Sequence, residues 1–178
     1  SATRYSILPR ITDACKMVNR YYTWSIVARG IEVSSAIELT RKIRDAIPLS
    51  ATMQFSIEHL QAGEIRVKAP LSPNINIHGT GFAGSLYSIA VLTGWALCTQ
   101  LIDEAGIDAD LVVARAEISY RAPVNGDIEC SCSTSVEQRE LFLQAIHERG
   151  KGKLSLDIVV GDLPQANLLA TFVAIARS

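Results

Sequence analysis

The chain has 178 residues, 48% of them hydrophobic, and a formal net charge of −1 at pH 7. This length and composition predict one globular domain with a sizeable core. The near-neutral charge offers no general attraction to nucleic acid or to an anionic membrane, so we expect neither as a partner. The four cysteines lack the spacing of a zinc site or a disulfide framework, and no signal peptide opens the chain, which predicts a reduced, cytoplasmic protein. We expect no metal and no cofactor.

The first elements in chain order are an unassigned segment and a helix. Residues 1–33 are apolar but follow neither the helical nor the strand period for long, so we interpret them as an N-terminal extension or the remnant of a preceding domain. A helix is predicted over 34–47, with Ser34 or Ser35 as N-cap and Pro48 as its end. One stripe along this helix, which we expect to be buried, consists of Ile37, Thr40, Ile43, Arg44 and Ile47.

Alternating apolar and polar residues predict six strands. They cover residues 53–58, 64–69, 112–121, 128–135, 154–160 and 168–176. Turn-forming residues join the first two strands into one hairpin and the next two into a second hairpin. The last strand is apolar on both faces, which is typical of a strand covered on both sides, near the sheet centre or at a subunit contact. Residues 139–149 fit either a short helix or a continued strand.

A long apolar helix separates the two predicted hairpins. Its apolar run, 86–102, contains polar residues and is shorter than the roughly 20 residues that a bilayer core requires, so we expect a buried helix. The preceding loop of small residues, 76–85, presents backbone N–H groups and the positive end of the helix dipole, an arrangement that can polarise a carbonyl. The order of elements predicts an α+β fold in which one antiparallel sheet wraps around this helix and a second copy covers the rest.

Two motifs carry a family resemblance. The first is Pro73-Asn74-Ile75-Asn76-Ile77-His78-Gly79-Thr80-Gly81-Phe82-Ala83-Gly84-Ser85-Leu86-Tyr87, followed by Leu92-Thr93-Gly94-Trp95, and the second is Ile118-Ser119-Tyr120-Arg121-Ala122-Pro123-Val124. Over roughly residues 34–177 the chain resembles the hotdog-fold thioesterases, in particular the thioesterase domains of the YiiD C-terminal type. The resemblance implies a hotdog fold for residues 34–178 and a homodimer or dimer of dimers. It also implies an acyl thioester site at the subunit interface, with the carbonyl near the start of the central helix.

The sequence departs from the family pattern at one important position. In many acyl-CoA thioesterases of this fold, an Asp or Glu follows about two turns into the central helix, and this position falls at about Val91 here. The loop Asn and first Gly of that pattern match Asn76 and Gly79, whereas its His-Gly-Gly matches Phe82-Ala83-Gly84. The carbonyl-polarising part is therefore retained, and the usual water-activating carboxylate is missing.

Five residues are candidates for catalysis: Asn76, His78, Gly84, Ser85 and Thr93. His78 is either a general base, since imidazole titrates near neutral pH, or a loop histidine bonded to backbone. Asn76 either holds the water or the thioester oxygen or closes a turn. Backbone N–H groups near Gly84 and Ser85 can stabilise an oxyanion. The hydroxyl groups of Ser85 and Thr93 either assist the reaction or bond the carbonyl one turn back.

The acyl chain is expected to lie along the central helix. The residues predicted to bind it are Phe82, Ala83, Leu86, Tyr87, Ile89 and Ala90. The basic side chains that could hold the phosphates of CoA or of an acyl-carrier phosphopantetheine are Arg115, Arg121, Arg149, Lys151 and Lys153.

These residues favour hydrolysis of an acyl thioester carried by CoA or an acyl-carrier protein. A hydratase or dehydratase would use the same polarising helix end, but such enzymes usually need a paired His and carboxylate that the sequence does not offer. A non-catalytic acyl-thioester-binding or dimerisation module is the alternative from another class, and Val91 at the usual acidic position supports it.

Overall fold

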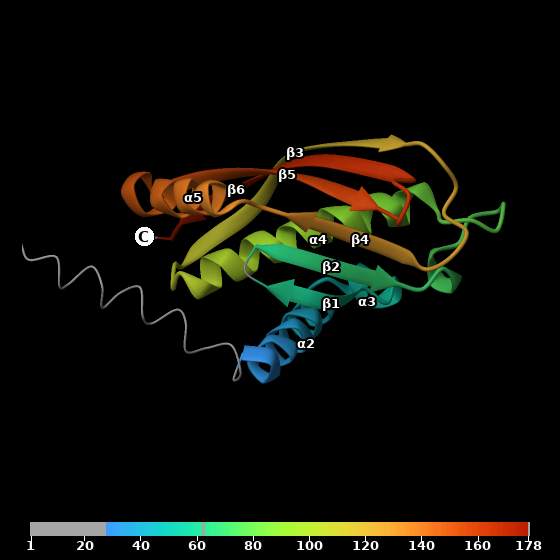
Figure 1. Ribbon diagram of the computed structural model, residues 1–178, viewed down its shortest axis with the longest axis horizontal. Helices are drawn as coiled ribbons and strands as arrows, with labels where there is room; N and C mark the ends of the chain where they lie inside the picture. The colour runs from blue at the N-terminus through green and yellow to red at the C-terminus, as the bar shows by residue number, and fades with distance from the viewer. Residues whose placement is uncertain (1–27, 62, 178) are drawn as a thin grey trace, which may run out of the picture.

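The computed structural model describes residues 28–61 and 63–177 (Figure 1). Most of the segment predicted as an extension or domain remnant, 1–33, lies outside these residues. The described elements are α2 (Ala28–Ala46), α3 (Pro48–Thr52), β1 (Ser56–Gln61), β2 (Glu64–Ala69), the 3-10 helix η1 (Ser72–Asn74), α4 (Ala83–Glu104), β3 (Ala109–Tyr120), β4 (Ile128–Ser133), α5 (Val136–Arg149), β5 (Lys151–Val160) and β6 (Ala166–Ala176).

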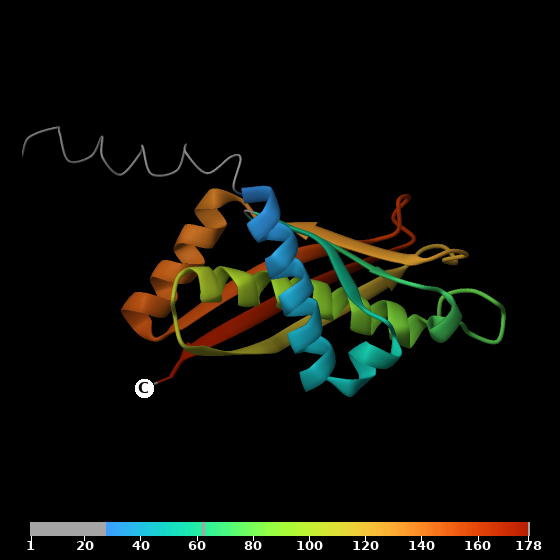
Figure 2. The same ribbon diagram turned by 90° about the horizontal axis from the view of Figure 1, so that it is seen from below.

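The six strands form one antiparallel sheet in the order β1-β2-β4-β5-β6-β3. This sheet curves around α4, which runs along its concave side (Figures 1 and 2). The side of α4 that faces the sheet carries Ile89, Ala90 and Leu97, none of which has exposed surface. The predicted α+β architecture, an antiparallel sheet wrapped around a long central helix, is confirmed.

The second predicted hairpin is wrong. β3 pairs with β6 along its whole length, from Ala109 opposite Ala176 to Tyr120 opposite Ala166, whereas β4 lies between β2 and β5. Alternation identified both strands, but it carries no information about which strand pairs with which. The segment between them, residues 121–127, instead crosses toward the start of α4, where Val124 O accepts a hydrogen bond from Gly81 N (2.8 Å).

The first helix, α2, is longer than predicted, and one residue of its predicted buried stripe is exposed. It begins at Ala28, so Ser34 and Ser35 lie inside the helix and are not its caps. Because Gln54 turns the chain with a φ of 56°, the first strand begins at Ser56 and not at residue 53.

Contacts between α2 and the chain around β1 hold the helix in place. Its buried residues include Leu39 and Ile43, whereas Ile37, expected in the buried stripe, is 63% exposed. Thr40 Oγ1 accepts a hydrogen bond from Ile57 N (3.0 Å), and Arg44 Nε donates one to Phe55 O (2.8 Å). Two side chains predicted on the buried stripe thus anchor the helix through polar contacts.

Residues 139–149, which the pattern left open, belong to helix α5. Its start is a capping box: Ser135 Oγ accepts from Gln138 N (3.1 Å), and the Gln138 side chain accepts from Ser135 N (3.0 Å). Its end is Gly150, whose φ of 66° is the left-handed conformation of a helix C-cap. The capping box and the C-cap glycine can both be recognised in the sequence, and they indicate a helix where the hydrophobic pattern alone does not decide between helix and strand.

The central helix α4 has 22 residues, longer than its apolar run of 86–102. By length and composition it could cross a membrane, but 56% of its most apolar window is buried inside the fold, as in the core helix of a globular domain. Cys98 on α4 and Cys130 and Cys132 on β4 are buried thiols, and this burial raises the pKa of each. Cys130 and Cys132 are therefore small core residues.

Candidate active site at the start of the central helix

The loop that precedes α4 is shaped by the side chain of Asn76. Asn76 Oδ1 accepts hydrogen bonds from His78 N (2.8 Å) and Thr80 N (3.2 Å). Asn76 Nδ2 donates to Thr80 Oγ1 (2.9 Å) and Gly81 O (3.3 Å). A backbone bridge between Ile75 and Gly81 closes the loop. The amide therefore has the turn-forming role that was the alternative reading for Asn76.

Asn74 joins this loop to the rest of the fold. It is 1% exposed, and its Nδ2 donates hydrogen bonds to Met53 O (2.9 Å) and Pro70 O (2.8 Å). Its own carbonyl accepts from Phe82 N (2.7 Å), the residue that caps α4. The chain on both sides of the loop is thus fixed by buried contacts.

The first turn of α4 offers backbone donors. Phe82 caps the helix without a side-chain hydrogen bond, and the first helical bond runs from Leu86 N to Phe82 O (3.0 Å). The N–H groups of Ala83, Gly84 and Ser85 consequently have no acceptor within the part of the chain that the structure describes. Together with the positive end of the helix dipole, they form a site for a developing negative charge.

The ring of Phe82 lies over this first turn. A Cβ added at Gly84 would stand 2.5 Å from Phe82 Cε1, so glycine lets the ring lie against the helix. Phe82 is 53% exposed, and Tyr87, one turn further along, is 37% exposed. These two predicted substrate-binding residues and Ala83 therefore do surround the backbone donors, with aromatic surface open to a ligand.

Tyr120 is a residue of this site that the sequence-based candidates omitted. It comes from the end of β3, and its hydroxyl donates a hydrogen bond to Ala83 O (2.8 Å). Burial and the neighbouring Tyr87 raise the pKa of Tyr120. Tyr120 belongs to the second sequence motif, which could have pointed to it. Only the folded chain, however, shows that β3 ends beside the start of α4.

Three other predicted substrate-binding residues lie elsewhere. Leu86 is 3% exposed, and Ile89 and Ala90 have no exposed surface, because all three are part of the hydrophobic core. An acyl chain cannot lie against side chains that are already covered, so this prediction is corrected. The half-buried side of α4 consists of Val91, Leu92 and Trp95.

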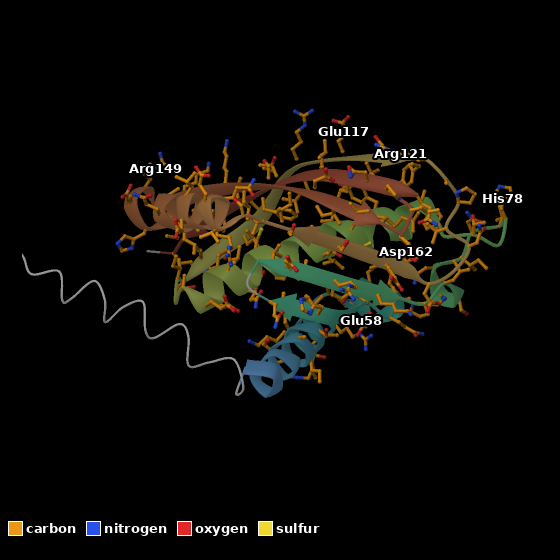
Figure 3. The ribbon with its side chains drawn as sticks, in the orientation of Figure 1. Glu58, His78, Glu117, Arg121, Arg149 and Asp162 are labelled. Carbon is orange, nitrogen blue, oxygen red and sulfur yellow. The ribbon has the colours of Figure 1, made fainter. Side chains whose placement is uncertain are left out.

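The predicted catalytic residues are only partly brought together. Thr93 is fully buried, and its Oγ1 donates to Ile89 O (2.8 Å), the alternative one-turn-back bond, so it lies away from the loop and inside the core. Ser85 is half-buried in the first turn of α4. His78 is exposed at the tip of the loop and projects away from the helix (Figure 3). Only its backbone N–H is bonded, to Asn76.

The charged groups considered for the site are spread over the molecule (Figure 3). Glu117 pairs with Arg115 (3.3 Å), and both side chains are more than 60% exposed on β3. Arg149 lies at the end of the molecule opposite His78 (Figure 3), so the five basic residues considered for a phosphate do not form one cluster. Among the described residues, no group of three or more His, Cys, Asp or Glu side chains could hold a metal ion.

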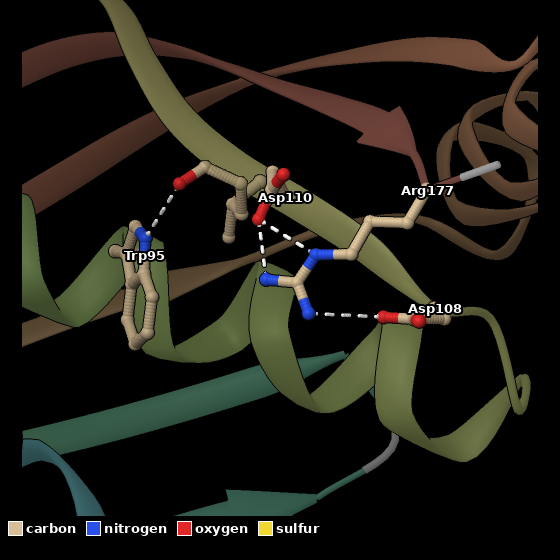
Figure 4. Close-up of polar contacts among 5 residues, drawn as sticks. Trp95, Asp108, Asp110 and Arg177 are labelled. Atoms are coloured by element: carbon tan, nitrogen blue, oxygen red, sulfur yellow. Dashed lines mark hydrogen bonds and ion pairs between the residues drawn. The ribbon is translucent and has the colours of Figure 1, made fainter.

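Two separate contacts lie beside α4 (Figure 4). In the middle of the helix, Trp95 Nε1 donates to Leu111 O of β3 (3.2 Å), which holds Trp95 against that strand. Arg177, just after β6, bonds to Asp110 of β3 and pairs with Asp108 (3.3 Å). The hydrogen bond from Arg177 lowers the pKa of Asp110.

Comparison with known proteins shows which family the chain belongs to. The family described as "Putative thioesterase (yiiD_Cterm)" matches residues 36–175. A "putative thioesterase" from Shewanella oneidensis is 32% identical, with a TM-score of 0.69 over 80% of this chain and 98% of that one. A "Probable Thioesterase" from Pseudomonas aeruginosa is 26% identical, with a TM-score of 0.69 over 79% and 96%.

A protein of unknown function from Chlorobaculum tepidum TLS superposes with a TM-score of 0.76 at 27% identity, over 80% of this chain and 94% of that one. The family match spans α4 and all six strands, and thus includes the loop, the backbone donors and Tyr120. On these grounds the chain belongs to the YiiD C-terminal family of hotdog thioesterases.

Proposed function

We propose that the protein hydrolyses an acyl thioester whose carbonyl oxygen lies at the N-terminus of α4. The observation that carries this proposal is the set of N–H groups at Ala83, Gly84 and Ser85 with no acceptor among the described residues. A tetrahedral intermediate places negative charge on that oxygen, and each suitably placed donor is worth roughly 3–4 kcal/mol in such a state. Family membership supports the same class of reaction.

The reaction divides into addition of water and loss of the thiol. Water adds to the thioester carbon, its proton passes to a base, and the C–S bond then breaks to release the thiol and the carboxylic acid. His78 is the base we propose, because it is the titratable side chain carried by the loop itself. Phe82 and Tyr87 would flank the thioester, and the half-buried Val91 and Trp95 would guide the acyl chain.

We also propose the carrier of the acyl group and the oligomeric state of the active protein. The carrier is CoA or the phosphopantetheine of an acyl-carrier protein, since both present the same thioester. The active unit is a homodimer or a dimer of dimers, in which a second copy covers the half-buried side of α4. Within the described residues, Val91, Leu92 and Trp95 on that side are only partly buried.

A proline substitution tests the carbonyl-polarising step. Ala83 is the first residue of α4, and Phe82 before it is extended, with φ −68° and ψ 128°, so proline fits there without breaking the helix. Ala83→Pro removes one backbone donor. Release of free thiol from acyl-CoAs of short to long chain should fall by roughly 100-fold in kcat, the usual cost of one oxyanion donor.

The matched control is Val136→Pro, the same change at the first residue of α5, where Ser135 is also extended. It should leave turnover unchanged. A wild-type protein that turns over substrate, with an Ala83→Pro variant equally active, would contradict the polarising role of this N–H.

The first turn of α4 contains no acidic residue and Val91 stands at the usual acidic position, which favours a second candidate, a non-catalytic acyl-thioester-binding module. Such a module would show no thiol release from any substrate but would bind a non-hydrolysable acyl-CoA thioether in calorimetry. Hydrolysis above background by the wild-type protein would exclude it.

A further inference from the structure

A groove between α5 and β5 is separate from the start of α4. It has a volume of about 790 Å³ and lies at the end of the molecule marked by Arg149 in Figure 3, opposite His78. One side of α5 supplies its apolar wall through Leu141, Phe142 and Ala145. We propose that this groove binds an acidic amphipathic helix of a partner protein.

The apolar wall is exposed to a degree that a partner would relieve. Leu141 is 59% exposed, whereas Phe142 behind it is 1% exposed and fixes the helix to the core. Ala145, one turn further along, is 7% exposed, so Leu141 supplies most of the exposed apolar surface of this wall. An exposed leucine backed by buried apolar residues is a contact for the apolar side of a second helix.

The other wall is basic. Lys151 and Lys153 project from the same face of β5, with Arg149 just before them, and no carboxylate lines the groove. In the described part of the chain, none of the three forms an ion pair. Lysines two residues apart on a strand stand roughly 6–7 Å apart, close to the pitch of about 5.4 Å that separates carboxylates one turn apart on a helix.

The shape of the site favours a helix over a compact phosphate. Phosphates bind where several backbone N–H groups converge at a helix N-terminus. Here the nearest helix end is the C-terminus of α5, at Arg149 and Gly150, whose partial charge is negative. Carboxylates spaced along a partner helix can each pair with one basic side chain of the groove without contacting the C-terminus of α5. The apolar residues between those carboxylates contact Leu141.

The groove is rigid before any partner arrives. The capping box at Ser135 fixes the start of α5, and Gly150 fixes its end. A Cβ added at Gly152 would stand 2.6 Å from Phe142 O, so α5 lies in close contact with β5. A preformed groove loses little conformational freedom on binding.

Fluorescence anisotropy of a labelled peptide tests the proposal with the full chain. The peptide is an amphipathic helix with leucines on one side and glutamates along one flank, and its control has the same composition in scrambled order. We expect saturable binding of the amphipathic peptide alone, weakened by added salt because the contacts include charges. Equal binding of the scrambled peptide, or no binding of either, would overturn the proposal.

Two pairs of variants locate the binding. Lys153→Glu should weaken binding by about tenfold, and Arg66→Glu, an equal charge change on exposed β2, should not. Leu141→Ser should weaken binding by at least about fivefold, and Leu163→Ser, at an 80% exposed leucine elsewhere, should not. If the two variants of either pair weakened binding equally, or if CoA displaced the peptide, the groove would not be the binding site of an acidic helix.

Discussion

At the scale of single residues, Asn76 and His78 have different roles in the loop before α4: Asn76 shapes the loop, and His78 leaves its side chain exposed. All four hydrogen bonds of the Asn76 side chain stay within residues 76–81. His78 contributes only its backbone N–H to this network, so its imidazole is available for chemistry. The sequence offered both residues as equivalent candidates, because spacing does not reveal what a side-chain amide bonds to.

Substitutions at the two positions should therefore have different effects. His78→Ala should lower kcat by roughly 100-fold or more, the usual contribution of a general base, and leave the melting temperature unchanged. Asn76→Ala should lower both, because the loop loses its internal bonds. Thiol release and thermal unfolding measure the two effects. Full activity in His78→Ala would mean that the base lies elsewhere, such as on a second copy.

At the scale of elements, the packing of α4 on the sheet depends on Gly94. A Cβ added there would lie 2.7 Å from Phe172 Cε2 and 3.3 Å from Ile158 Cδ1, and both side chains have no exposed surface. Glycine thus sets the close approach of the helix to β5 and β6. This explains physically why a glycine interrupts an otherwise apolar helix.

Gly94→Ala should destabilise the fold despite alanine's better helix propensity. The propensity gain is about 1 kcal/mol, whereas overpacking a rigid core costs about 1–3 kcal/mol. We expect a net loss in the free energy of unfolding by urea. Gly84→Ala is the control in the same helix: there the added Cβ meets the exposed Phe82 ring, which can move, so the free energy of unfolding should not fall.

The sequence predicted the elements better than their partners. Period and capping signals identified α4 and six strands, because these depend on residues close together in the chain. The pairing of β3 with β6 joins residues that lie 46 to 67 positions apart in the chain, from Tyr120 with Ala166 to Ala109 with Ala176, and the turn signal at 123–127 suggested a hairpin that does not form. For the same reason Tyr120 was missed, while Ile89 and Ala90 were assigned to the wrong side of α4.

At the scale of the whole molecule, β3 leaves one edge of the sheet open. It has 12 residues and is the last strand in the sheet, so its outer edge is unpaired within the described residues. Val112, Val113 and Tyr120 along it are 48%, 38% and 49% exposed. A long apolar edge of this kind favours pairing with another strand, and a second copy of β3 is the partner we propose.

Light scattering during size-exclusion chromatography tests this assembly. The wild-type protein should have the mass of a dimer or tetramer, and Val113→Lys should shift it toward the monomer, because a lysine on an edge strand opposes pairing. Ser133→Lys, at an exposed residue of β4, should leave the mass unchanged. A monomeric wild-type protein at micromolar concentration would contradict the homodimer.

The self-contained loop also affects how the protein can change over time. Ile77 is 95% exposed, and its side chain and that of His78 hold nothing in place; the bonds that shape the loop belong to Asn76, Thr80 and Gly81. Residues 77 and 78 can therefore be substituted without loss of the hydrogen bonds that shape the loop. Substitutions at these two positions would change the surface beside the site, and with it the ligand that the protein accepts, at little cost in fold stability.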